Sequence, residues 1–172
     1  MTSPPADLDH LVFAVPDLDA AVADLGRRLG VAPVPGGRHE GLGTRNALLG
    51  LGGGAYLEVI GPDPDQDEPP TGRAFGVHPA MAPALVAWAA RATDIDPSRA
   101  VAMRRTRPDG VVLAWRLTLP VLDGVEPFLI DWGDSEHPSV GLAAVTLERF
   151  EVDRDPPALR ATIRGPAGAV DL

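Results

Sequence analysis

Residues Leu8–Ala20 read LDHLVFAVPDLDA, a short alternating strand that runs directly into the start of a helix. Successive side chains of a strand point to opposite faces, so Leu11 and Phe13 share one face while His10 shares the other with Val12. A proline then ends the strand, and an aspartate that can cap a helix follows it. The pattern therefore places a single histidine on one face of a predicted sheet, where it can form part of a site.

The composition limits the classes of function. The chain has 172 residues, of which 45% are hydrophobic, enough for one well-buried domain or for two small modules that share a core. A net charge of −9 argues against nucleic acid and against an anionic membrane as partners. With no cysteine in the sequence, disulfides and thiolate ligands are excluded.

All basic residues are arginine, which is typical of a high-GC, bacterial-like coding bias and excludes Schiff-base lysine chemistry. The N-terminal segment has neither the positive charge nor the apolar run of a signal peptide. No apolar stretch has the length of a membrane span. We therefore expect a soluble, cytoplasmic protein.

The same order of elements occurs twice along the chain. The first copy is predicted to contain, after the strand at its start, a helix over Asp17–Gly30, strands over Val31–Val34, Thr44–Leu51 and Ala55–Ile60, and a glycine-rich loop, PGGRHEGLG. The second copy is predicted to contain a strand over Leu85–Ala92, a short helical turn over residues 93–100, and strands over Val101–Thr106, Val111–Leu119 and Pro127–Gly133.

The repeat suggests a division of the chain. We expect a first βαβββ module over 8–61, an acidic and proline-rich linker over 62–80, and a second, degenerate βαβββ module over 81–140. The remaining residues, 141–172, are expected to form a β-rich C-terminal extension that covers the sheet rather than building a further site.

A strand–helix–three-strand unit used twice, with histidine in the first strand and glutamate in the fourth, resembles the vicinal oxygen chelate superfamily. Within it, LDHLVFAVPDLDAA, GGRHEGLGTRNALL and AYLEVIGP, followed by RTRPDGVVLAWRL, PFLIDWG and HPSVG, resemble the glyoxalase-like domain proteins over roughly residues 8–141. The resemblance implies an α+β fold in which two paired βαβββ modules form a cup-shaped mixed sheet. It also implies a small-molecule site in that cup.

In the superfamily that the chain resembles, metal ligands commonly come from the first and fourth strands of each module. His10 and Glu58 stand at these positions in the first module, which favours one divalent ion such as Zn, Ni, Mn or Fe. The equivalent positions of the second module hold Ala87 and Ile130, so half of such a ligand set is missing.

Three sources can supply the missing ligands. A bulge can turn Asp131 inward, a loop can bring in His39 or His137, and a second subunit of a homodimer can contribute across an interface. Without them, His10 and Glu58 form a polar pair in a metal-free pocket, with the carboxylate orienting the imidazole.

Further residues are candidates for ligand contact, each with a structural alternative. His39 either contacts a ligand or belongs to a flexible glycine-rich loop, and the tryptophans either wall a pocket or pack the core. Arg104, Arg105, Arg107 and Arg116 either recognise a carboxylate or line the solvated edge of a hairpin. The complete predicted ligand-binding set is His10, His39, Thr44, Asn46, Glu58, Trp115, Asp131, Trp132 and His137.

Two functions therefore compete. The first is a metal-dependent lyase, isomerase or dioxygenase acting on a small oxygenated substrate, with Glu58 as the catalytic proton carrier and His10 and Glu58 holding the metal. The second is a metal-free protein that binds or sequesters a small molecule, as resistance proteins do. The missing ligands at Ala87 and Ile130 favour the second function, or an enzyme of unusual metal coordination.

Overall fold

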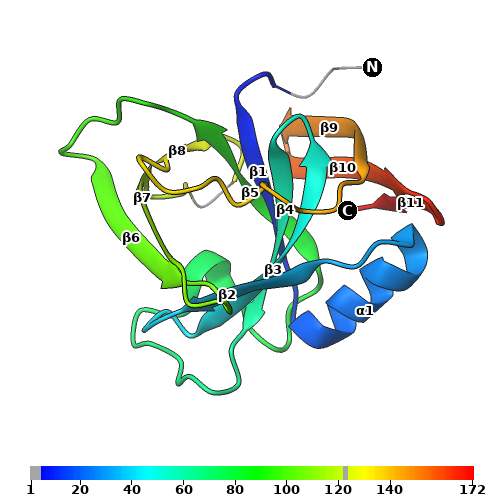
Figure 1. Cartoon of the computed structure of the whole chain (residues 1–172), viewed down its shortest axis with the longest axis horizontal. Helices are drawn as coiled ribbons and strands as arrows, with labels where there is room; N and C mark the ends of the chain where they lie inside the picture. The colour runs from blue at the N-terminus through cyan, green and yellow to red at the C-terminus, as the bar shows by residue number, and fades with distance from the viewer. Residues whose placement is uncertain (1–4, 122–123) are drawn as a thin grey trace.

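Strand β1 (Leu8–Ala14) lies at the centre of an eight-stranded mixed sheet with the order β2-β3-β4-β1-β5-β8-β7-β6 (Figure 1). This computed structural model describes residues 5–121 and 124–172. The sheet curls into a cup that is nearly a closed barrel. The α+β, cup-shaped fold predicted from the sequence is confirmed.

Each half of the sheet repeats one topology. The first half contains β1, α1 (Leu18–Leu29), β2 (Val34–His39), β3 (Thr44–Gly52) and β4 (Ala55–Pro62). The second contains β5 (Ala84–Arg91), β6 (Ala100–Thr106), β7 (Val112–Thr118) and β8 (Phe128–Asp131). In each half the fourth strand pairs with the first in parallel, and β1 joins β5 in antiparallel pairing. The two modules therefore share one sheet, and the boundaries 8–61 and 81–140 stay a prediction.

Between β5 and β6 the second module has a single helical turn in place of the full helix of the first module. Residues 93–100 form a turn in which the Asp96 carboxylate accepts hydrogen bonds from the backbone and hydroxyl groups of Ser98. The Ala100 N–H donates to the Asp96 carbonyl at 3.1 Å, which is the i to i+4 hydrogen bond of one helical turn. The predicted short helical turn is therefore present as a single turn over residues 96–100, and β6 begins at its end.

Helix α1 forms where the sequence predicts it. The Asp17 carboxylate accepts a hydrogen bond from the Ala20 N–H at 3.0 Å, and Gly30 ends the helix with a φ of 75°. Leu25 and Leu29 are buried against the convex face of the sheet. No helix in the described part of the chain is long and apolar enough to cross a membrane.

The two faces of β1 support two separate cores. Leu11 and Phe13 belong to the larger core, between the sheet, α1 and the C-terminal sheet. Val12 belongs to a smaller core on the concave face, where Phe128 and Ile130 of the second module meet it. The alternation predicted for Leu8–Ala20 thus separates the face that stabilises the fold from the face that carries the polar residues.

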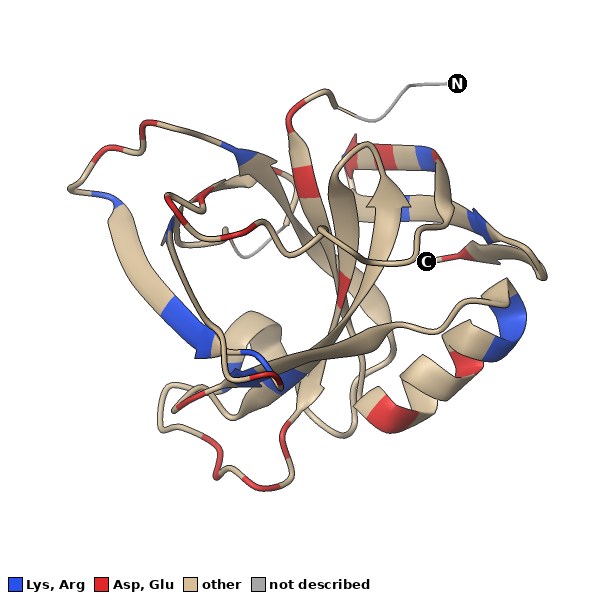
Figure 2. Ribbon diagram, viewed as in Figure 1, with Lys and Arg blue, Asp and Glu red and all other residues tan. Residues whose placement is uncertain are grey.

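The two edges of the cup meet where β2 approaches β6. A Cβ atom at Gly37 of β2 would lie 2.7 Å from the Thr106 carbonyl oxygen, so a side chain there would keep the edges apart. Figure 2 shows arginines at the end of β6 where it reaches β2. The loop predicted for this part of the chain is wrong: Gly36 and Gly37 lie in strand β2, because the opposite edge comes close.

The linker between the modules is acidic, and its charges lie mostly on a peripheral loop (Figure 2). Asp63 is the exception, because it is buried and accepts a hydrogen bond from the Gln66 amide at 2.8 Å. A 3-10 turn, η1 (Ala74–Gly76), follows and brings Phe75 to the mouth of the cup.

The C-terminal extension forms a separate three-stranded antiparallel sheet of β9 (Thr146–Arg154), β10 (Pro157–Gly165) and β11 (Gly168–Asp171). It covers the convex face of the large sheet through Phe150 and Ile163. The Ala167 N–H donates to the Leu29 carbonyl at 2.9 Å, which attaches the extension to the end of α1.

We predict that Gly165→Ala destabilises the protein by about 1–3 kcal/mol, because the added methyl group would clash with the Leu29 carbonyl oxygen. Urea unfolding measures the change. The neighbouring substitution Arg164→Ala, which removes only an exposed ion pair with Glu148, is the control and should leave the midpoint nearly unchanged. Equal midpoints for the two variants would contradict the close packing of the extension on α1.

Candidate functional site

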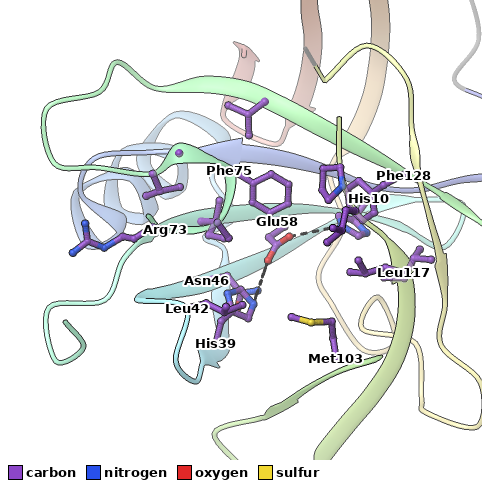
Figure 3. A pocket seen from close by; sticks show the side chains of 18 of the residues that line it. His10, His39, Leu42, Asn46, Glu58, Arg73, Phe75, Met103, Leu117 and Phe128 are labelled. Carbon is purple, nitrogen blue, oxygen red and sulfur yellow. Dashed lines mark hydrogen bonds and ion pairs between the residues drawn. The ribbon is translucent and has the colours of Figure 1, made fainter. Parts of the chain in front are cut away.

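The concave face of the sheet encloses a cavity of about 1160 Å³. Most of its wall is apolar and includes Phe75, Met103, Leu117 and Phe128 (Figure 3). The polar residues gather on one side, chiefly on strands of the first module: His10, His39, Asn46, Glu58 and, from β6, Arg105. A large apolar cavity with a few convergent polar groups is the usual form of a small-molecule site.

Glu58 is the centre of the polar group. Its two carboxylate oxygens lie 3.7 Å from His10 Nε2 and 3.7 Å from His39 Nε2 (Figure 3). The Asn46 amide donates to Glu58 Oε1 at 2.6 Å. Burial alone would raise the pKa of Glu58, but the two imidazoles, Asn46 and Arg105 outweigh it and lower the pKa. Glu58 is therefore an ionised carboxylate.

His10 is held from behind by its neighbour in the sequence. The Asp9 carboxylate lies 2.7 Å from His10 Nδ1, and both residues are buried. Regular alternation would place Asp9 on the opposite face, but the pairing of β1 with β5 shifts register between Leu8 and His10. This bulge brings both side chains to one side. Because a carboxylate only accepts, Nδ1 carries the donated proton and Nε2 faces Glu58.

Asp9 also has hydrogen-bond and ion-pair partners in the second module. His137 Nε2 lies 2.9 Å and Trp132 Nε1 3.3 Å from Asp9 Oδ2, and the Arg91 guanidinium lies 3.3 Å from the same oxygen. Burial alone would raise the pKa of Asp9, but the hydrogen bonds from His10 and His137 outweigh it and hold the pKa well below its ordinary value. A fully buried anion is thus satisfied from several elements at once.

His39 lies on strand β2 rather than on the predicted loop. Its Nδ1 lies 2.9 Å from the Thr44 hydroxyl, and its Nε2 lies 3.4 Å from the Asn46 amide nitrogen. Burial lowers the pKa of His39, so this imidazole is neutral. Thr44 therefore orients His39 and does not itself line the cavity.

Of the remaining predicted residues, the structure places Trp115 and Trp132 in the cavity wall, with ring centroids 5.1 Å apart. Asp131 lies outside the cavity lining, where it accepts from Arg116 at 2.6 Å and from the Gly133 N–H at 2.9 Å. His137 does not line the cavity; it hydrogen-bonds to Asp9 and lies edge-on to the Tyr56 and Trp132 rings. The inward turn of Asp131 considered from the sequence is therefore wrong.

Two residues of the site were missed from the sequence. Asp9 precedes His10 in the strand, and a bulge brings its side chain into the site. No pattern in the sequence predicts this bulge. Tyr56, two residues before Glu58 on the same face, stacks on the His10 ring with centroids 4.7 Å apart and planes inclined by 20°. Burial and the nearby carboxylates raise the pKa of Tyr56, which keeps the phenol neutral.

The donor set does not fit a tightly held divalent ion. No group of three or more His, Cys, Asp or Glu side chains in residues 5–121 and 124–172 is arranged to hold one. The Asn46 amide nitrogen contacts both His39 Nε2 and Glu58 Oε1, so these two atoms already have a partner. His10 Nε2 and the second Glu58 oxygen remain as possible metal ligands. Catalytic metal sites in proteins commonly use three protein ligands.

A curled sheet built from two modules, each with its first and fourth strands parallel, defines the class as the vicinal oxygen chelate superfamily. The model of the family described as "Glyoxalase-like domain" matches residues 8–164. The chain belongs to this family.

A solved structure of methylmalonyl-CoA epimerase from Mycobacterium tuberculosis is similar to this chain, with 21% sequence identity and a TM-score of 0.46. The match covers 76% of this chain and 90% of that chain. No curated protein matches the sequence. Members of the superfamily often use a divalent metal ion.

We predict that Asp9→Asn lowers the free energy of unfolding at pH 7 by on the order of 3 kcal/mol, because an amide cannot accept from all the donors around Asp9. The pKa of Asp9 is lower in the folded protein than in the unfolded chain. Its stabilisation is therefore complete above the ordinary pKa of an aspartate and is lost progressively below about pH 4.

Urea unfolding at pH 7 and at pH 3 measures this effect. The difference between the wild type and Asp9→Asn should shrink at pH 3. Asp131→Asn, which alters a carboxylate outside the cavity, is the matched control and should change stability far less. An equal destabilisation by Asp9→Asn at both pH values would contradict the assigned role of the Asp9 carboxylate.

Proposed function

We propose that this protein is a metal-independent enzyme that moves a proton on a small molecule held in the cavity, with His10 as the base. The observation that carries the proposal is the position of His10: its Nδ1 is 2.7 Å from the buried Asp9 carboxylate, and its Nε2 is on the cavity side, 3.7 Å from Glu58. An imidazole oriented by a carboxylate is a frequent general base.

His10, Asp9 and Glu58 would each have a different role in the reaction. The His10 imidazole accepts a proton through Nε2 from a carbon next to a carbonyl group of the ligand, and Asp9 keeps the ring in the required tautomer. The imidazolium that forms is stabilised by both neighbouring carboxylates. Return of the proton to another carbon completes an isomerisation, and loss of a leaving group completes an elimination.

Glu58 is less suited to the role of base than the sequence suggested. Its pKa is lowered by the imidazoles, Asn46 and Arg105, and a carboxylate with a lowered pKa is a weaker proton acceptor. We therefore assign Glu58 to stabilising charge on His10 and to accepting a hydrogen bond from the ligand. No step of the proposed reaction passes through a metal ion.

A second candidate function is binding without chemistry, in which the protein sequesters its ligand. The size of the cavity and its apolar wall of Phe75, Met103 and Leu117 favour it, because such a cavity can bury most of a small organic molecule. The cytoplasmic location, the small-molecule ligand and the possible homodimer stay proposals. The net charge of −9 supports the exclusion of nucleic acid and of anionic membranes.

We predict that removal of metal ions leaves the protein unchanged. An ion that binds the folded state raises the melting temperature. Because we expect no ion to bind, addition of Zn²⁺, Ni²⁺, Mn²⁺ or Fe²⁺ in modest excess after dialysis against EDTA should shift the melting temperature by less than about 1 °C. A rise of several degrees that disappears in both His10→Ala and Glu58→Gln would establish a metal site and overturn the metal-independent reaction.

We predict that the protein exchanges protons next to a carbonyl group. Phenylpyruvate and related aryl ketones are incubated with the protein in D₂O, and deuterium incorporation is followed by NMR. His10→Gln should slow the exchange by about 100-fold or more, as expected for loss of a general base. Glu136→Gln, an exposed carboxylate outside the cavity, is the control and should keep the wild-type rate.

The melting temperature is measured with the same compounds. Stabilisation without deuterium incorporation by the wild type would favour the sequestering function over the enzyme. An exchange rate in His10→Gln equal to that of the wild type would remove His10 from the role of base.

A further inference from the structure

Arg105 is a buried cation without a carboxylate partner among the described residues. Only 4% of the residue is exposed, and no described Asp or Glu oxygen lies within 4.0 Å of its guanidinium. The other described arginines that lack an ion pair, Arg99 and Arg104, are exposed to solvent. A buried charge is ordinarily paired, because its removal from water is costly.

The position of Arg105 on β6 directs its side chain into the cavity. Val101, Met103 and Arg105 alternate with outward residues along the strand, and all three line the cavity. Two glycines of β2 make room for the arginine. A Cβ atom at Gly36 would lie 2.5 Å from Arg105 NH1, and one at Gly37 would lie 3.6 Å from Arg105 Cδ. The two edges of the cup thus meet around this side chain.

The guanidinium retains donors for a further partner. It carries five N–H groups, and the hydrogen bond found for it in the described structure runs from NH1 to Asn46 Oδ1 at 2.8 Å. Asn46 in turn donates to Glu58. The Glu58 charge therefore acts on Arg105 across the amide, without occupying the planar pair of donors that suits a carboxylate.

We infer that Arg105 binds the carboxylate of the ligand, and that the ligand is a small carboxylic acid with an apolar body. The inference rests on the proposed use of this cavity as the ligand site. The Asn46 amide is the only group between Arg105 and Glu58 in this chain of hydrogen bonds. A ligand carboxylate bound to Arg105 would therefore place the next carbon atoms of the ligand beside Glu58 and His10. The apolar part of the ligand then extends along Met103, Leu117 and Trp115.

A purely structural role for Arg105 predicts something different. If the arginine serves only to balance Glu58 through Asn46, the cavity has no preference between a carboxylate and a neutral group of the same shape. A matched pair of ligands separates the two roles, and binding can be measured without any chemical step.

The test compares 3-phenylpropanoate with its neutral amide, 3-phenylpropanamide, by isothermal titration calorimetry. The wild type should bind the carboxylate at least about tenfold more tightly, as expected for a charge-assisted pair of hydrogen bonds. Arg105→Met should remove this preference while leaving the affinity for the amide within about twofold. Arg105→Lys, which keeps the charge without the planar donor pair, should retain a reduced preference.

Arg104→Met is the control, since Arg104 is exposed and adjacent on the opposite face of β6. It should keep the wild-type preference. Failure of the wild type to bind the carboxylate more tightly than the amide, or persistence of the preference in both Arg105 variants, would overturn the inference. His10→Gln should retain the preference while losing proton exchange, so failure of the proposed reaction and failure of the carboxylate site give different results.

Discussion

The hydrogen bonds that converge on the buried Asp9 carboxylate connect the two halves of this protein. Asp9 belongs to the first strand of the first module, while its hydrogen-bond donors His137 and Trp132 and its ion-pair partner Arg91 belong to the second half of the chain. A buried anion is costly unless its lone pairs are satisfied, so these contacts stabilise the folded state in which the two halves meet. The same arrangement fixes the ring of His10 toward the cavity, so that stability and site geometry depend on one carboxylate.

The two modules have taken different roles around one cavity. The first supplies His10, His39, Asn46 and Glu58, while the second supplies most of the apolar wall. Ala87 and Ile130, which stand where the second module would carry a histidine and a glutamate, belong to the small core on the concave face. Apolar side chains at these two positions offer no ligand atoms to a metal ion. They make dispersion contacts instead, which favours an organic ligand. Arg105 is the one charged residue that β6 directs into the cavity.

Where the structure of a segment differs from the one predicted, the physical cause can be identified. The glycine-rich composition of PGGRHEGLG predicts a loop, but Gly36 and Gly37 lie in strand β2, where the lack of a side chain permits the close approach of β6. The short helical turn predicted over residues 93–100 is present, because the Asp96 carboxylate accepts from the Ser98 N–H and the Asp96 carbonyl from the Ala100 N–H. His39, predicted as a ligand contact on a glycine-rich loop, lies on strand β2 and lines the cavity, while its contact with a ligand stays a prediction.

The sequence by itself determined the paired fold, the two faces of β1 and the shared face of His10 and Glu58, because alternation and repetition are local properties of a chain. Only the tertiary structure decided that Asp9 orients His10, since this depends on a bulge in the pairing with β5. It also decided that Arg105 reaches Asn46, 59 residues away, rather than lining a solvated hairpin edge. Both contacts arise from how the sheet curls and closes, and no local pattern of residues encodes that closure.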